Sequence, residues 1–110
     1  MEEKSASALR SRRARLLRTL PSLEHVLRGS LIERYLRCGK PGCKCAQGVG
    51  HGPKYYLSVS FTGHRPRMDY VRQGDFEHVS QYLANYQQLR GAIEEICEIN
   101  RELLRRREAL

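Results

Sequence analysis

The sequence lacks long apolar runs. Within its 110 residues, no apolar stretch approaches the roughly 18 residues that a membrane-spanning helix requires. The arginine-rich N-terminal segment also lacks the uninterrupted apolar core of a secretory signal. These absences exclude an integral membrane helix, and we expect a cytoplasmic protein with no membrane partner.

The known catalytic motifs are absent as well. The sequence contains no Ser/His/Asp arrangement, no paired carboxylates, no phosphate-cradling glycine motif and no H-E-x-x-H pair. Asp69, Asp75 and His78 are each explained by a position in a strand or near the start of a helix. We therefore expect that the protein is not an enzyme.

Acidic residues are scarce in the first two thirds of the chain. Residues 1–72 carry fifteen Lys and Arg against five Asp and Glu, a net charge of +10, whereas residues 73–110 carry five against seven, a net charge of −2. The whole chain has a net charge of +8. Such an excess favours a polyanionic partner, with nucleic acid as the first candidate and an anionic membrane surface as the second.

The basic N-terminal segment, residues 1–29, has helical periodicity. Five arginines and no acidic residue fall within residues 10–18. Four leucines recur at helical spacing between them: Leu9, Leu16, Leu17 and Leu20. The pattern predicts a basic helix over residues 5–19 that ends before Pro21. A solvated helix face is the alternative to nucleic-acid binding, although like charges this close repel each other without a polyanion nearby.

The central segment, residues 30–73, predicts a small β domain. Three stretches have strand character: Leu31–Arg37, Tyr55–Thr62 and Pro66–Arg72. The last two flank a turn that contains glycine and predict a hairpin. Alternation predicts that Arg65 and Arg67 lie beside Tyr56 on one face, while Met68 and Tyr70 point inward. An ordinary solvated sheet face is the alternative to a binding surface.

The last segment, residues 74–110, predicts one long helix with a heptad seam. A helix of about 35 residues is about 50 Å long and needs a second helix beside it. That helix is either the N-terminal helix folded back or a second copy of the chain, for which Asn100 would set the register. We expect a homodimer or a larger protein complex. The predicted dimer seam contains Tyr86, Leu89, Ile93, Ile96, Asn100 and Leu103.

A cysteine cluster gives the most specific signal. The spacing C-x4-C-x-C-x5-H places Cys38, Cys43, Cys45 and His51 within fourteen residues, on a segment rich in glycine. Three thiolates and one imidazole are a donor set that zinc prefers, and four protein ligands make the site structural. His64 is the second candidate for the fourth ligand. Free core thiols, a redox switch and an iron–sulfur cluster remain as alternatives. Cys97 is expected to be a small core residue.

Together these features predict an α+β protein with a small, zinc-stabilised, three-stranded antiparallel sheet. A basic N-terminal helix and a long C-terminal coiled-coil helix flank it. The expected function is non-catalytic DNA binding; a protein-interaction adaptor and an RNA-binding module are the alternatives. The candidate nucleic-acid contacts are Arg10, Arg12, Arg13, Arg15, Arg37, Lys40, Lys44, Lys54, Tyr56, Arg65 and Arg67.

The sequence resembles a family of small, uncharacterised bacterial proteins. The resemblance rests on the motifs RGSL at residues 28–31, RCGKPGCKC at residues 37–45 and HGPKYYLS at residues 51–58. The sequence departs from the family pattern at Lys54, where tyrosine is common, and at residues 63–65 of the turn. The resemblance implies an accessory or regulatory role near DNA, because family members often accompany transposases and other mobile elements. More loosely, three strands followed by a helix are similar to the arm-binding domains of tyrosine-recombinase integrases.

Overall fold

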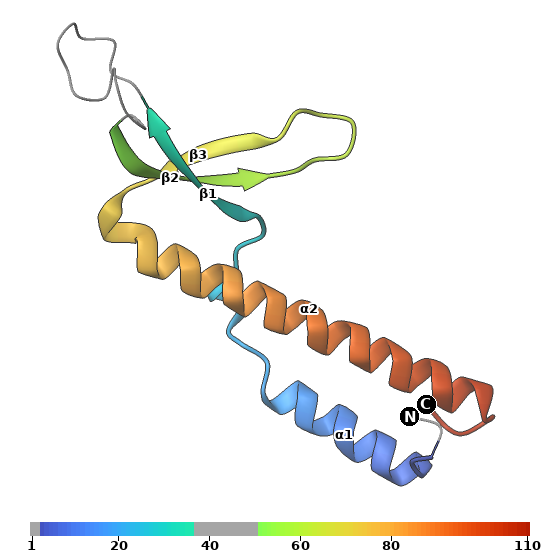
Figure 1. Cartoon of the computed structure of the whole chain (residues 1–110). Coiled ribbons are helices and arrows are strands. Elements are labelled where there is room, and N and C mark those ends of the chain that lie inside the picture. Colours follow the sequence, from blue (N-terminus) through green and yellow to red (C-terminus); the bar gives the residue numbers. More distant parts are fainter. Residues whose placement is uncertain (1–2, 37–50) are drawn as a thin grey trace, which may run out of the picture. The chain divides into compact units, whose positions relative to one another are not determined.

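The computed structural model describes residues 3–36 and 51–110 (Figure 1). The predicted α+β class is confirmed, with a three-stranded antiparallel sheet and a long C-terminal helix. In chain order the elements are α1 (Ala6–Arg18), the 3-10 helix η1 (Leu23–His25), β1 (Ser30–Leu36), β2 (His51–Val59), β3 (Arg67–Val71), the 3-10 helix η3 (Gln73–Asp75) and α2 (Phe76–Arg105). In the part of the chain that is described, neither helix combines the length and apolar character that crossing a bilayer demands.

The chain divides into two compact units. The helical unit consists of Met1–Val26 and Ala84–Leu110, and the sheet unit consists of Leu27–Leu83. Helix α2 contributes to both, because its residues up to Leu83 belong to the sheet unit and the remainder to the helical unit. The predicted division at residues 29 and 73 follows the order of the elements, whereas the units group segments that are distant in sequence.

Local sequence signals explain the bounds of α1. Ser5 is the N-cap, and its side-chain oxygen accepts a hydrogen bond from the backbone N–H of Ala8. At the other end, the backbone N–H of Thr19 donates to the carbonyl oxygens of Arg15 and Leu16. The predicted helix over residues 5–19 is therefore confirmed to within one residue at each end.

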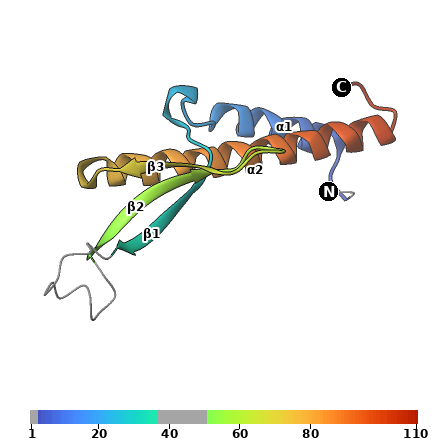
Figure 2. The same ribbon diagram turned by 90° about the horizontal axis from the view of Figure 1, so that it is seen from above.

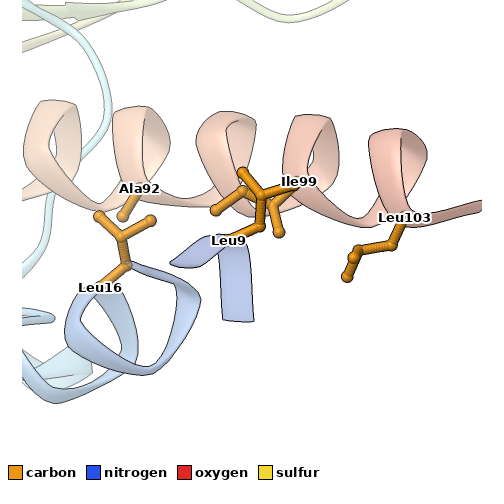
Figure 3. Close-up of a cluster of buried hydrophobic side chains, with 5 residues drawn as sticks. All are labelled: Leu9, Leu16, Ala92, Ile99 and Leu103. Carbon is orange, nitrogen blue, oxygen red and sulfur yellow. The ribbon is translucent and has the colours of Figure 1, made fainter. Parts of the chain in front are cut away.

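In the helical unit, α1 runs antiparallel to α2. Residues later in the N-terminal segment contact residues earlier in α2: Arg12 bonds to Glu95, and Thr19 bonds to Gln88. The core between the helices consists of Leu9, Leu16, Ala92, Ile99 and Leu103 (Figure 3). The N-terminal helix thus folds back within one chain, which is one of the two arrangements that the sequence allows.

The face of α2 that meets α1 differs from the predicted seam. Ile99 and Ala92, which the heptad leaves out, are buried, whereas Ile93 is 49% exposed. Leu103 is fully buried and Ile96 packs against the core, so only part of the seam lies in this contact. Adjacent apolar stripes on one helix are separated by a rotation of about 100°, and the sequence does not choose between them. Pairing between two chains stays a prediction.

The end of α2 turns back through a left-handed residue. The backbone N–H of Glu108 donates to the carbonyl of Leu103, and that of Arg107 to Leu104. This pair of bonds is a Schellman motif, and Arg107 holds the left-handed position with φ 60°. The turn directs the last residues to α1, where the Arg10 side chain donates to the carbonyl oxygen of Ala109.

In the sheet unit, the strands are ordered β1-β2-β3, and both pairs are antiparallel (Figure 2). On one face Leu57 and Val71 are buried, and the Tyr55 ring contacts that of Phe76 at the start of α2 with centroids 4.6 Å apart. We call this the covered face. Gly29 has φ +139°, and a Cβ there would lie 2.7 Å from the Ser58 carbonyl oxygen, so this position requires glycine.

The register between β2 and β3 corrects the predicted faces. Tyr56 pairs with Tyr70 and Ser58 with Met68, so Met68 and Tyr70 lie on the face opposite to Leu57 and do not point inward. Arg67 pairs with Val59 and lies on the covered side, away from Tyr56. Alternation within a strand is a local property, but the pairing of two strands depends on how many residues the hairpin loop removes from the ladder.

Candidate nucleic-acid interface

The face opposite to Leu57 forms three rows of side chains across the strands. We call it the tyrosine face. Its rows follow from the register: Arg34 with Lys54; Ile32 with Tyr56 and Tyr70; and Ser30 with Ser58 and Met68. These eight residues include two cations and no carboxylate, because Glu33 and Asp69 alternate to the covered face. The only charged residues among these eight are therefore basic, and two of the others are aromatic.

The first row places two cations directly opposite each other. Arg34 and Lys54 are cross-strand partners, and both are exposed. Like charges directly opposite each other on neighbouring strands destabilise a sheet. The Arg34 guanidinium carbon lies 5.7 Å from the centroid of the Tyr56 ring, within the range of a cation–π contact. An anionic ligand between Arg34 and Lys54 would reduce the repulsion that the two cations have in the isolated sheet.

The second row contains the aromatic part of the face. The rings of Tyr56 and Tyr70 meet edge to face, with centroids 5.7 Å apart and planes at 62°. Tyr56 is half-buried, whereas Tyr70 on the edge strand β3 is 56% exposed. Met68, in the next row, is 37% exposed. An apolar surface thus borders the two cations.

An open hollow adjoins this face at the end of β3. It has a volume of about 480 Å³ and is lined by Pro53, Lys54, Tyr55, Tyr70, Val71 and Gln73. This volume falls within the range of about 300–1,000 Å³ that small-molecule sites occupy. Lys54 and Tyr70 therefore belong both to the tyrosine face and to a concave feature beside it.

A second basic cluster lies at the other end of β2. The guanidinium carbons of Arg28 and Arg67 lie 5.2 Å and 5.1 Å from the centroid of the Phe61 ring. Arg28 also donates to the carbonyl oxygen of Ser60 at 2.9 Å. Arg65 is exposed in the same hairpin loop, where Gly63 has φ +76°. The structure therefore places the predicted contacts Arg65 and Arg67 at the hairpin end, apart from Tyr56.

The arginines of α1 bond mainly to α2. Arg12 forms a two-pronged ion pair with Glu95, from Nε to Oε2 at 2.6 Å and from Nη2 to Oε1 at 3.0 Å. Arg13 donates to Oδ1 of Asn100 at 2.5 Å, and Arg10 to the carbonyl oxygen of Ala109 at 2.7 Å. Arg15 is exposed near the end of the helix. Three of the four α1 arginines that are predicted to bind nucleic acid are thus engaged within the helical unit.

Ion pairs in the helical unit shift the pKa of two carboxyl groups. The hydrogen bond from Arg12 lowers the pKa of Glu95. Glu102 is buried and accepts hydrogen bonds from Arg105 and Arg106, which lower its pKa to about 2. Arg106 also donates to the carbonyl oxygen of Lys4 and so connects the segment before α1 to the end of α2. The Arg12–Glu95 pair joins α1 to α2, whereas the ion pairs of Glu102 lie within the C-terminal end of the chain.

The predicted zinc ligands fall mostly outside the described residues. Cys38, Cys43 and Cys45 lie there, as do three predicted nucleic-acid contacts, Arg37, Lys40 and Lys44. His51 is described by its backbone alone, as the first residue of β2 and the partner of Leu36. Within residues 3–36 and 51–110, no cluster of three or more His, Cys, Asp or Glu could hold a metal ion. Cys97, expected in the core, is exposed.

The sequence pattern does not predict a binding role for two members of the tyrosine face, Arg34 and Tyr70. Arg34 belongs to β1, whose mixed polar and apolar residues show no clear alternation, and only its pairing with Lys54 indicates a function. Tyr70 was assigned to the interior because it alternates with apolar Met68. Lys54 and Tyr56 were predicted as contacts, and the structure brings them together on this face. Only the strand register places Arg34 and Tyr70 on the same face as Lys54 and Tyr56.

A family model described as a domain of unknown function, DUF6788, matches residues 6–81. The chain belongs to the DUF6788 family. The DUF6788 match begins at the first residue of α1, includes the whole sheet and ends within α2. It therefore contains every residue of the tyrosine face. Comparisons with curated proteins and with solved structures gave no match.

Proposed function

We propose that this DUF6788 protein is a non-catalytic nucleic-acid-binding protein and that its tyrosine face is the binding surface. The observation that carries the proposal is the cross-strand pair of Arg34 and Lys54 beside Tyr56 and Tyr70, on a face without carboxylates. Phosphate oxygens accept hydrogen bonds from guanidinium and ammonium groups, and bases contact aromatic rings. A bound phosphate would also relieve the repulsion between the two cations.

Binding of labelled DNA as a function of salt concentration tests this function. We expect measurable affinity at low salt and a steep decrease as salt rises, because phosphate contacts release counterions. The double variant Arg34→Gln with Lys54→Gln should reduce the log–log slope by roughly 0.7–0.9 for each lost phosphate contact. The double variant Arg90→Gln with Arg101→Gln removes the same charge from exposed positions of α2 and should bind almost as wild type. Absence of binding at low salt to single-stranded DNA, duplex DNA and RNA alike would refute the proposal.

We further propose that zinc stabilises the segment between β1 and β2. The cross-strand pairing of Leu36 with His51 brings the two ends of that segment to neighbouring positions, two residues before Cys38 and at His51 itself. Three thiolates and one imidazole fit zinc, which would act structurally with Cys38, Cys43, Cys45 and His51 as ligands. Such a site would supply stability that a small sheet lacks.

Metal analysis of protein purified without chelator tests the zinc site. We expect one zinc per chain in the wild type and in Cys97→Ser, because Cys97 is an exposed cysteine of α2. The Cys43→Ser variant should lose the metal and melt at a lower temperature. A wild-type content far below one zinc per chain contradicts this site and leaves DNA binding to be judged by its own experiment.

We propose that the protein has an accessory or regulatory role in a transposon or recombination system. The family resemblance to proteins encoded near mobile elements supports it, together with DNA as the expected polyanion. Recovery of the DNA crosslinked to the protein in cells is the decisive measurement. We expect enrichment of mobile-element ends; enrichment of cellular RNA instead would favour the RNA-binding module.

A protein-interaction adaptor is the second candidate, and exposed apolar side chains of the helical unit favour it. Leu17 on α1 is 57% exposed, and Ile93 and Leu104 on α2 are 49% and 59% exposed. A second copy of the chain is the partner that the heptad pattern predicts. Light scattering should then give twice the chain mass for the wild type and a single chain mass for Ile93→Glu. A monomeric wild type contradicts the homodimer.

A further inference from the structure

The two tyrosines of the tyrosine face differ in how much ring surface they leave open. The Arg34 guanidinium and the Tyr70 ring both contact Tyr56, and the half-buried Tyr56 ring is thereby held in place. Tyr70 has a single ring contact among the described residues, with Tyr56, and it is 56% exposed on the edge strand. Tyr56 therefore acts as a support, and Tyr70 presents ring surface to a ligand.

The spacing of the rows relates this ring surface to the two cations. Lys54 and Tyr56 are two residues apart on β2, which corresponds to about 7 Å along a strand. One nucleotide can span such a distance between its phosphate and its base. The hollow beside the face is lined by both Lys54 and Tyr70, so one concave space borders a cation of the first row and the exposed ring.

Duplex and single-stranded nucleic acids present different groups to such a surface. In a duplex the faces of the bases are stacked on one another, and only base edges reach the grooves. In a duplex, an exposed tyrosine ring on the sheet therefore has no free base face on which to stack. In a single strand each base has a free π-face, and stacking on an aromatic side chain strengthens binding about 5- to 150-fold per base.

We propose that the ligand of the tyrosine face is single-stranded nucleic acid, with a base stacked on Tyr70 and phosphates bound by Arg34 and Lys54. This inference rests on the proposed function, because it specifies the class of nucleic acid that the same surface takes. It also assigns Tyr70 a role in binding that the sequence pattern does not indicate.

The experiment compares one labelled DNA strand of mixed sequence, the same strand annealed to its complement, and an RNA strand of the same sequence. Fluorescence anisotropy at several salt concentrations gives the affinity of the full chain for each. We expect the single strands to bind about tenfold or more tightly than the duplex, since stacking adds to the phosphate contacts. The DNA and RNA strands should bind similarly if stacking dominates.

Variants of exposed tyrosines separate stacking from charge. Tyr70→Ala should weaken single-strand binding about tenfold or more and leave duplex binding unchanged, whereas Tyr70→Phe should retain binding because it keeps the ring. Tyr35→Ala is the matched control, since Tyr35 is 46% exposed on the same sheet but donates its hydroxyl to Glu33 of the covered face. Unchanged far-ultraviolet circular dichroism verifies that each variant folds.

The outcomes distinguish the two proposals. No binding to any of the three probes overturns the proposed function and this inference with it. Equal or tighter binding of the duplex overturns this inference while nucleic-acid binding stands. A third outcome is that single strands bind preferentially to the wild type and bind equally well to Tyr70→Ala. That result also overturns the assignment of Tyr70, because removing a ring on which a base stacks must weaken single-strand binding.

Discussion

Basic side chains have different partners in the two units. In the helical unit, Arg12 pairs with Glu95 and Arg13 donates to Asn100, so two arginines of α1 are bonded to α2. In the sheet unit, Arg34 lies over Tyr56, and Arg28 and Arg67 lie near Phe61, with no carboxylate in these contacts. A dense run of arginines therefore does not show by itself which of these side chains are available to a ligand, because the neighbours of each arginine decide what it contacts.

The largest expected effect tests how the helical unit is held together. Leu9 is 1% exposed in the core, and Leu9→Ala should lower the free energy of unfolding by about 2–5 kcal/mol. Leu17, one of the four predicted helix leucines, is 57% exposed, so Leu17→Ala should change it by less than about 0.5 kcal/mol. Urea unfolding followed by circular dichroism measures both. Similar losses in the two variants would contradict the observed α1 face.

A glycine substitution makes the corresponding test in the sheet unit. Gly29→Ala should destabilise the sheet by about 2 kcal/mol or more, because the new Cβ meets the Ser58 carbonyl at a positive φ. Gly91→Ala in α2 is the control, since a Cβ there meets nothing within 4 Å and should stabilise the helix by about 0.5–1 kcal/mol. Tyrosine fluorescence during unfolding follows the sheet. A neutral Gly29→Ala would show that the close approach to β2 is not required.

Acid should weaken the helical unit through Glu102. Its pKa lies at about 2 in the folded chain, below the ordinary value of 4.5, because Arg105 and Arg106 donate to it. Because folding lowers the pKa of Glu102, ionised Glu102 stabilises the fold at pH values above its ordinary pKa of 4.5. This contribution disappears as the pH falls from 4.5 towards 2. Melting temperatures across that range should fall for the wild type and fall less for Glu102→Gln. Parallel curves would show that the Glu102 pairs add no stability.

The last prediction compares how two arginines, one from each unit, affect the affinity for single-stranded DNA. Arg12→Gln should leave affinity for single-stranded DNA almost unchanged, because the Arg12 guanidinium is engaged by Glu95. Arg34→Gln removes the same charge from the tyrosine face and should lower the salt slope by about 0.7. Anisotropy titrations at matched salt concentrations compare the two. Equal losses would mean that total charge, and not the local surroundings of each arginine, governs binding.

Local features could be predicted well from the sequence. Helix α1 follows from the Ser5 cap and the leucine spacing, and the hairpin follows from alternating strands around the turn at Gly63. The candidate site could be predicted only in part. Lys54 and Tyr56 are both predicted contacts, although only Tyr56 lies in the predicted strand Tyr55–Thr62. Arg34 and Tyr70 come from strands whose register depends on the loops between them.

By itself, the sequence determined the class and order of the elements, the excess of positive charge and the cysteine spacing. These properties depend on neighbours a few residues apart, whose periodicity and turn preferences are local. Only the tertiary structure decided that Ile99 faces α1 while Ile93 is exposed, that Tyr70 lies outside the sheet core, and that Arg13 bonds to Asn100. A rotation of about 100° on a helix, or a shift of one residue between strands, exchanges buried and exposed side chains.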